Sequence, residues 1–273
     1  MENAIKPLNR SHELRANDND VKHLTIKIAD LNIEIECLYC NAFFGFSKYL
    51  SFSSTPDIKI VISQGDIEKE RLYHPEIKSP DIYIDNENVA VTYDYGCLEP
   101  FVALKQLANS VIPFDTFLMH GSVVALDNQA YMFTAPSGVG KTTRTKLFLD
   151  LYPGSVVVNG DKPLIKVAPT QVIACGTPWC GKEGWNTNTM VPLRAIFLLE
   201  RAGEGEESSI EEVSLGKAFP FLLQQTHRPE NPDLMRKTLT LLKSLEGKVK
   251  IYKFRSTPTE ESVLLAYETA KAM

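Results

Sequence analysis

Long apolar runs are missing from this sequence of 273 residues. The apolar stretch at residues 195–199 is far shorter than the roughly 20 residues that a helix needs to cross a bilayer. No basic and apolar leader with a small-residue cleavage site opens the chain, whose first 20 residues are polar. These absences predict a protein that has no membrane partner and resides in the cytoplasm.

Cysteine and positive charge are also scarce. The five cysteines are an odd, sparse set that does not resemble the disulfide framework of a small secreted protein. Cys37 and Cys40 have the spacing of metal ligands, but no second pair or histidine follows at a useful distance, so we assign them to structure. Lysine and arginine total 29 against 34 acidic residues, which argues against a nucleic-acid partner held by a generally basic surface.

The residue patterns of the chain indicate two domains with a boundary near residue 113. Residues 23–28, 33–36 and 58–62 alternate or are briefly apolar, as β-strands are. A helix should follow, with Pro100 in its first turn and an apolar face that includes Phe101 and Leu107. We expect a small β-rich accessory domain over residues 1–112, with a polar N-terminal segment, and an α/β domain over residues 113–273.

The second half begins with a predicted hairpin. Residues 117–126 and 130–134 are expected to form two strands joined by a turn, and the second strand runs directly into a glycine-containing loop. A helix is predicted from residue 142 to 151. Residues 155–158 then predict a buried strand that ends at Asn159, Gly160 and Asp161.

The glycine-containing loop has a specific pattern. Residues 135–142, A-P-S-G-V-G-K-T, match the phosphate-binding pattern G-x-x-x-x-G-K-[ST], with Ala135 in place of the first glycine. Gly138 and Gly140 let the backbone turn its N–H groups toward phosphate oxygens, and Lys141 supplies a charge to the terminal phosphates. The Thr142 hydroxyl is within reach of a Mg²⁺ ion in such loops, so ATP and Mg²⁺ are the expected cofactors.

The predicted nucleotide-binding set extends into the first turn of the following helix. The helix dipole disfavours a cation at Arg144, so either an anionic ligand compensates its charge or the side chain is solvated. The set consists of Ser137, Gly138, Val139, Gly140, Lys141, Thr142, Thr143 and Arg144.

Three further residues are candidates for the chemistry. Asp161 follows the carboxyl end of a neighbouring strand, where a carboxylate can hold Mg²⁺ or take a proton from a hydroxyl; a simple turn residue is the alternative. His120 is either brought to Asp161 by the hairpin or is an ordinary core histidine. Lys182 stands in a segment with glycines on both sides, which either brings a cation onto phosphate or is a surface turn.

The order of these motifs resembles the catalytic domain of HPr kinase/phosphorylase, a P-loop kinase fold related to phosphoenolpyruvate carboxykinase. The matching residues are His120 with Gly121, the loop through Thr142, and Asp161. The resemblance implies a mixed sheet over roughly residues 113–273, with His120 beside an acid. That family has a pair of acids where this chain keeps one, so Asp161 is either general base or metal ligand. Lys182 lies about where the kinases have an arginine.

The leading hypothesis is an ATP- and Mg²⁺-dependent kinase that transfers the γ-phosphate to a hydroxyl. The acceptor is a serine of a small protein or peptide, or a small molecule. A non-catalytic nucleotide-binding scaffold and an enzyme like phosphoenolpyruvate carboxykinase are the alternatives. The resemblance also implies a homo-oligomer, which no feature of the sequence requires. The acceptor and the role of residues 1–112 are left open.

Overall fold

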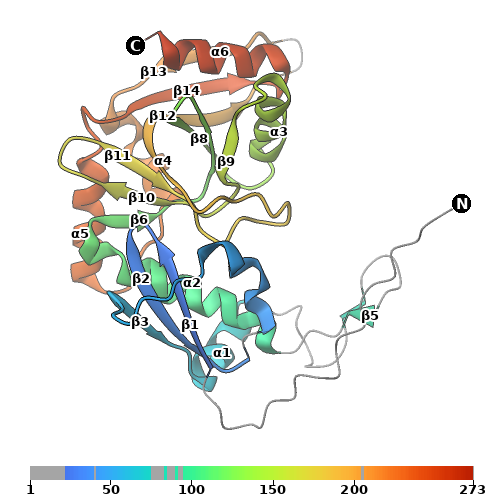
Figure 1. Ribbon diagram of the computed structural model, residues 1–273. Helices are drawn as coiled ribbons and strands as arrows, with labels where there is room; N and C mark the ends of the chain where they lie inside the picture. The colour runs from blue at the N-terminus through green and yellow to red at the C-terminus, as the bar shows by residue number, and fades with distance from the viewer. Residues whose placement is uncertain are drawn as a thin grey trace, which may run out of the picture.

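The computed structural model describes residues 22–39, 41–74, 83–84, 90–91, 95–203 and 206–272. Within these ranges the chain forms a smaller part, built from residues up to about 110, and a larger part that contains the rest (Figure 1). The polar segment predicted at residues 1–20 lies outside the described residues, as does Cys40. No helix in the described ranges combines the length and the apolar character that crossing a membrane requires.

The smaller part is built on a three-stranded sheet. β2 pairs antiparallel with β1 and parallel with β3, and its alternate residues are buried. A second, two-stranded antiparallel sheet is formed by β4 and β5. The strands are β1 (Lys22–Ile28), β2 (Leu31–Cys37), β3 (Ile58–Val61), β4 (Tyr83–Ile84) and β5 (Ala90–Val91).

Helices also contribute to this part, which makes it more mixed than the β-rich domain that the sequence predicts. They are η1 (Asn41–Tyr49), α1 (Gln64–Arg71), η2 (Tyr95–Leu98) and α2 (Glu99–Ser110). Pro100 lies in the first turn of α2, as predicted. The buried face of α2 differs from the prediction, because Val102, Ala103 and Leu107 are buried whereas Phe101 is 45% exposed and lies against the ring of His74.

The larger part is built on a mixed sheet. Its main path runs β6-β10-β11-β12-β8-β7-β9, with β14 beside β12 and β13 beside β14. β8, β12 and β14 are parallel, whereas β7 runs antiparallel to both β8 and β9. The strands are β6 (Thr116–Leu118), β7 (Ser122–Leu126), β8 (Gln129–Thr134), β9 (Val156–Asn159), β10 (Leu164–Val167), β11 (Val172–Cys175), β12 (Met190–Arg201), β13 (Ser209–Glu212) and β14 (Lys250–Ser256).

The predicted hairpin before the loop is present, with one correction. Asp127 and Asn128 both have positive φ, the conformation of a tight turn that matches the twist of the strands it joins. The first strand does not run continuously over residues 117–126. It divides into β6, which pairs with β10, and β7, which pairs with β8, and residues 119–121 lie between the two.

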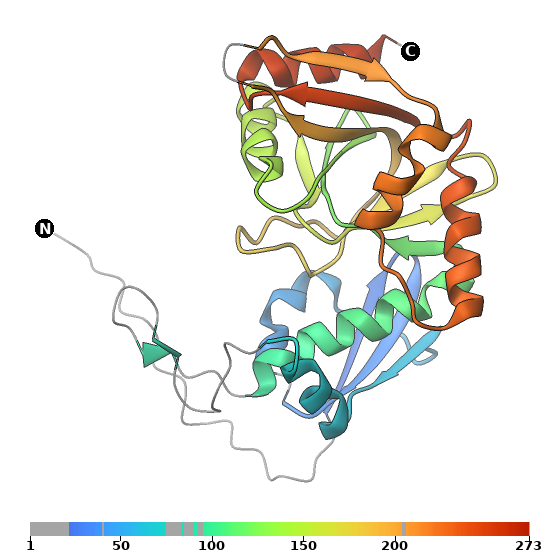
Figure 2. The same cartoon turned by 180° about the vertical axis from the view of Figure 1, so that it is seen from behind.

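Helices cover both faces of the large sheet. α3 (Lys141–Leu151) and α6 (Glu260–Lys271) pack on one face over a largely aromatic core that includes Phe133, Phe197 and Tyr267. α4 (Leu215–Gln225) and α5 (Pro232–Lys243) pack on the other face over an aliphatic core. α5 also contacts the short 3-10 helix η3 (Ile112–Phe114). Figure 2 shows these two helices on the side of the sheet away from α3.

One of the three hydrophobic clusters that the described residues form spans both parts of the molecule. Residues of the small sheet and α2 form a buried cluster that continues into Leu118, Leu164 and Trp179 of the larger part. The indole Nε1 of Trp179 also donates to the carbonyl of Pro100 at 2.7 Å. The parts therefore meet along β6, β10 and the segment after β11, next to residues 119–121.

Candidate functional site

Three segments meet at one edge of the large sheet. β8 continues into residues 135–140, called here the glycine loop; β9 ends two residues before Asp161; and β7 begins two residues after His120. Because β7 lies antiparallel between β8 and β9, its start lies at the same edge as the ends of the other two. The sequence predicted that the strand before Asp161 is the direct neighbour of the strand before the loop. That prediction was wrong, because β7 lies between β8 and β9.

The backbone of the glycine loop contains two residues with positive φ. Gly138 and Gly140 have φ of 82° and 109°, which side-chain-bearing residues rarely adopt. Ala135 is fully buried and is not among the described residues with positive φ, so an alanine causes no strain where the pattern has its first glycine. Ser137, Thr142 and Thr143 are exposed, and their hydroxyls make no hydrogen bond within the described part of the chain.

The first turn of α3 follows directly. Its N-cap is Gly140, and no side chain of the described residues caps its N–H groups. Such unpaired N–H groups, together with the helix dipole, favour an anion at this end. Lys141 is 8% exposed, and its ammonium group donates to the carbonyls of Ala135 at 2.8 Å and Pro136 at 3.2 Å. Burial lowers the pKa of Lys141, while the negative charge of Asp161 opposes that shift.

Arg144 does not face the loop's open side. It is fully buried, and its guanidinium donates to the Oγ of Ser256 at 2.6 Å, to the Ser256 carbonyl at 2.8 Å, and to the Val139 carbonyl. It also lies over the ring of Phe254, 5.4 Å from the centroid. No carboxylate pairs with it among the described residues, and burial lowers its pKa to about 10, so it remains charged at neutral pH.

Asp161 lies at the centre of the site. Its Oδ1 is 3.1 Å from His120 Nε2, its Oδ2 is 3.4 Å from Lys162 Nζ, and its side chain is 32% exposed. Burial acts to raise the pKa of Asp161, but the hydrogen bond from His120 and the charges of Lys162 and His120 outweigh it. The net pKa lies below the ordinary aspartate value, so the carboxyl is ionised at neutral pH.

His120 is held from two sides. Its Nδ1 is 3.0 Å from Oε1 of Gln225, and its backbone N–H donates to the Gln225 carbonyl at 2.7 Å. The next residue, Gly121, donates its N–H to the Asp161 carbonyl at 3.0 Å. The backbone of residues 119–121 therefore links the turn after β9 to the end of α4.

Asn159 fixes the turn that bears the acid, and the sequence analysis did not identify it as a site residue. Its Oδ1 accepts from the N–H groups of Asp161 at 2.8 Å and Lys162 at 2.6 Å. Its Nδ2 donates to the carbonyl and hydroxyl of Thr177 and to the carbonyl of Trp179. Asn159 is fully buried; the bonds that its Nδ2 donates are buried, and the two that its Oδ1 accepts are partly buried. An asparagine two residues before a candidate acid was the available signal.

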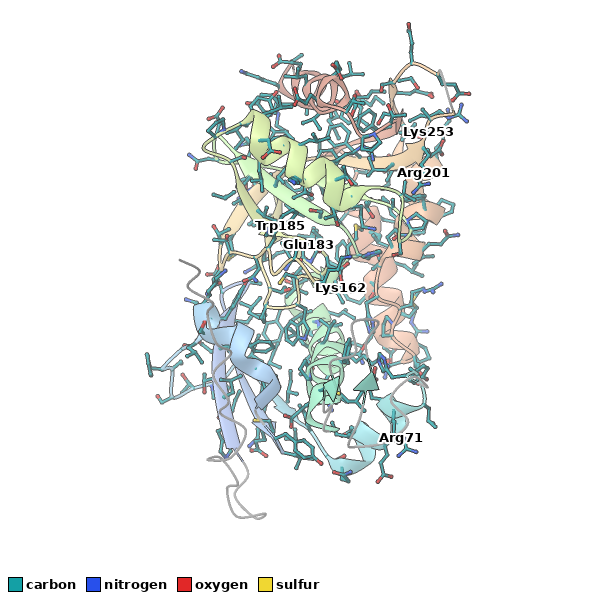
Figure 3. All side chains as sticks on the ribbon, turned by 90° about the vertical axis from the view of Figure 1, so that its right-hand side faces the viewer. Arg71, Lys162, Glu183, Trp185, Arg201 and Lys253 are labelled. Carbon is teal, nitrogen blue, oxygen red and sulfur yellow. The ribbon has the colours of Figure 1, made fainter. Side chains whose placement is uncertain are left out.

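The segment at residues 176–189 lies against this turn. The N–H of Gly160 donates to the Trp185 carbonyl at 2.9 Å, and a Cβ added to Gly181 would be 3.4 Å from the Cβ of Asp161. Figure 3 shows Glu183 and Trp185 on this segment, close above Lys162. Lys182 is exposed and forms no ion pair with any described residue. The structure thus brings this segment to Asp161, and the role of Lys182 stays a prediction.

Arg201 is a second residue that the sequence analysis missed. It ends β12, which is parallel to β8, so it lies at the same edge as the glycine loop. Its Nη2 donates to the carbonyl of Gly138, and Figure 3 shows its position toward one side of the molecule. The available signal was its place two residues after the apolar stretch at residues 195–199.

Only one group of three potential metal ligands occurs within the described ranges, and it lies far from this site in the chain. His23, Glu34 and Glu36 on the small sheet have ligand atoms within 4.8 Å of one another. Lys59 forms ion pairs with both glutamates and offsets part of their charge. The Mg²⁺ site at Thr142 and Asp161 stays a prediction.

Comparison with known proteins finds weak structural similarity and no match in sequence. No protein-family model matches the chain, and no curated protein does either. Among solved structures, the HPr(Ser) kinase/phosphatase from Coxiella burnetii matches over 57% of this chain and 93% of its own, with 12% identity and a TM-score of 0.32. Likeness at that level does not show a shared family.

Proposed function

We propose that the protein is an ATP- and Mg²⁺-dependent phosphotransferase that moves the γ-phosphate to an acceptor hydroxyl. The observation that carries the proposal is the position of Asp161. Its carboxylate lies 3.1 Å from Nε2 of His120, lies at the same sheet edge as the glycine loop, and interacts electrostatically with Lys141. A phosphate-binding loop that faces a held carboxylate is the arrangement that phosphoryl transfer to a hydroxyl requires.

The glycine loop and the first turn of α3 are the proposed phosphate site. The ammonium group of Lys141 now bonds to loop carbonyls, and the β- and γ-phosphates offer it stronger, charged acceptors. Ser137 and Thr143 present free hydroxyls beside it. Arg144 acts from behind the loop: a buried, unpaired positive charge next to Gly140 raises the potential that the phosphates experience.

The residues present also fit a magnesium ion. The exposed hydroxyl of Thr142 and the ionised carboxylate of Asp161 are hard oxygen donors of the kind that Mg²⁺ prefers. Mg²⁺ bound with the nucleotide would neutralise negative charge on the β- and γ-phosphates. Arg201, which contacts the Gly138 carbonyl, and the unpaired Lys182 are the cations available to do the same from the protein side.

Asp161 is the proposed general base. The acceptor oxygen attacks the γ-phosphorus, the bond from that phosphorus to the bridging oxygen of ADP breaks, and the acceptor proton passes to the carboxylate. His120 and Lys162 hold this carboxylate ionised and oriented. The low pKa of Asp161 makes it a weak base, which suits a loose transition state in which the proton leaves late.

Labelled ATP tests the proposal directly. With Mg²⁺ and a hydroxyl acceptor, we expect transfer of the γ-phosphate label. Lys141→Ala should abolish nucleotide binding, whereas Asp161→Asn should retain binding and lose about 10²- to 10⁴-fold in turnover, the usual contribution of a general base.

Lys146→Ala and Asp150→Asn are matched controls, because both side chains are exposed on the same helix. Neither should change binding or turnover. Full activity of Asp161→Asn would show that the mechanism is wrong. Binding without turnover by the unaltered protein would favour the nucleotide-binding scaffold, and oxaloacetate-dependent ATP consumption with release of CO₂ would favour a carboxykinase.

A further inference from the structure

A cavity opens beside His120, where the smaller part of the molecule meets the larger part. Its volume is about 240 Å³, smaller than pockets that take drug-sized ligands. Four segments form its walls: α2 of the smaller part, residues 118–120, the turn after β9 with Lys162, and the end of α4 with the two residues that follow it. The cavity therefore exists only where the two parts of the molecule meet.

The cavity shares two residues with the proposed catalytic site. His120 and Lys162 both line it, and both contact the carboxylate of Asp161, at 3.1 Å and 3.4 Å. Figure 3 shows Lys162 just above α2, at the level where the two parts meet. A molecule in this cavity is thus separated from the general base only by side chains that touch that base.

The polar groups in its wall favour an anion. Two lysines, Lys105 and Lys162, and two histidines line it, and none of its lining residues is an aspartate or a glutamate. Burial, followed by the charge of Lys105, lowers the pKa of His227, so this histidine is neutral at pH 7. Each ammonium group also pairs with a carboxylate that does not line the cavity, Lys105 with Glu70 and Lys162 with Asp161, so an anion in the cavity would share these two lysines with those carboxylates.

Lys105 is held in place by residues outside the cavity. Its Nζ is 2.5 Å from Oε2 of Glu70, which is 4% exposed, and 4.1 Å from the centroid of the Tyr73 ring. On the opposite wall, Nε2 of His227 is 2.8 Å from Oδ1 of Asn109 on α2, which ties the end of α4 to the smaller part. These contacts fix the width of the cavity before any ligand enters.

We propose that this cavity binds the phosphoryl acceptor, and that the acceptor is a small hydroxy compound with a carboxylate or phosphate a few bonds from its hydroxyl. The anionic group pairs with Lys105 and Lys162, while the hydroxyl is presented to Asp161 past His120. The inference rests on the kinase function proposed above, and it gives the smaller part a role in recognising the substrate.

Three probes of similar size test it. D-Glycerate carries a carboxylate, sn-glycerol 3-phosphate carries a phosphate, and glycerol carries neither, yet all three have free hydroxyls. We expect one or both anions to bind in ligand-observed NMR and to accept label from γ-labelled ATP, with glycerol doing neither. The two anionic arms separate a carboxylate acceptor from a phosphate acceptor.

Substitution then locates the binding site. Lys162→Gln should weaken binding of the preferred anion about tenfold or more, the usual loss for a charged hydrogen bond. The double variant Glu70→Gln with Lys105→Gln should do the same, and it leaves no buried carboxylate without its partner. Lys69→Gln, an exposed lysine on α1, is the matched control and should leave binding unchanged.

The failures of the two proposals are distinguishable. Equal binding of glycerol, binding of neither anion, or anion binding that survives both sets of substitutions would overturn the acceptor site. Anion binding that depends on Lys105 and Lys162, in a protein that transfers no label to any acceptor, would support the cavity as an anion site and overturn the kinase function instead.

Discussion

At the scale of single residues, the position of the Asp161 carboxylate depends on Asn159. The buried Asn159 amide accepts hydrogen bonds from two backbone N–H groups of the turn and donates to two carbonyls of the next segment. Its shape provides both a double acceptor and a double donor in one plane, which an aspartate or a leucine cannot do. Asn159 is therefore a positioning residue rather than a catalytic one.

Replacing Asn159 should separate turnover from nucleotide binding. Asn159→Ala leaves several buried polar groups unpaired, so we expect a loss of about 2–4 kcal/mol in the free energy of unfolding, measured with urea. The kcat should fall about tenfold or more, while the KM for ATP changes little, because the glycine loop is not touched. A simple loss of stability would not alter kcat in the protein that remains folded.

Asn188→Ala provides the control for this variant. The Asn188 side chain is exposed and donates to the Lys48 carbonyl at 3.1 Å, so its loss should change stability by no more than about 0.5 kcal/mol. An Asn159→Ala protein with unaltered kcat would contradict the positioning role.

At the scale of elements, the order β8-β7-β9 assembles the site. The ends of β8 and β9 and the start of β7 share one sheet edge, and the break between β6 and β7 allows residues 119–121 to bond on both sides. Gly121 occupies the tightest point of this break. A Cβ on it would lie 2.5 Å from Met132 Cε and 3.0 Å from the Phe133 carbonyl oxygen.

A methyl group at Gly121 should therefore disturb the site through the backbone. Met132 can move its flexible end, but the Phe133 carbonyl belongs to β8 and cannot, so Gly121→Ala should cost about 1–3 kcal/mol in stability. Because Gly121 bonds to the Asp161 carbonyl, turnover should fall as well. Urea unfolding and the labelled-ATP assay measure the two effects.

Gly216→Ala on α4 is the comparison, since nothing lies within 4 Å of a Cβ there. Its stability should be unchanged or slightly higher, because alanine favours a helix more than glycine does. If Gly121→Ala were as harmless as this control, the close packing at the break would have no functional meaning.

At the scale of the whole molecule, ligand binding and stability are linked. A nucleotide that binds only the folded chain at 100 times its Kd should add about 2.7 kcal/mol to the free energy of unfolding. For a chain of this size, that corresponds to a rise in Tm of roughly 5–10 °C. Thermal unfolding with and without ATP and Mg²⁺ measures it.

Lys141→Ala should lose this rise, because the variant lacks the ammonium group that meets the terminal phosphates. An equal rise in Lys141→Ala would place the nucleotide elsewhere on the molecule. This measurement needs no acceptor, so it tests nucleotide binding independently of the transfer reaction.

The sequence alone determined the local features of the site. The turn at Asp127 and Asn128, the strands β8 and β9, the glycine loop and helix α3 all follow from residue patterns that span a few positions. The proximity of His120 and Asp161 was also predicted, as one of two alternatives, and their 3.1 Å contact confirms it. Such patterns are legible because strand periodicity and turn geometry depend on near neighbours.

Only the tertiary structure decided what lies around that site. It placed β7 between β8 and β9, and it turned Arg144 into the core behind the loop instead of toward the loop's open side. It also surrounded Asn159 with its partners and joined His227 to Asn109, 118 positions away. These outcomes depend on which distant segments pack together, and no local pattern encodes that choice. The physical reason is that burial and hydrogen bonding are satisfied over the whole fold, so a side chain's direction is settled by partners that the nearby sequence does not contain.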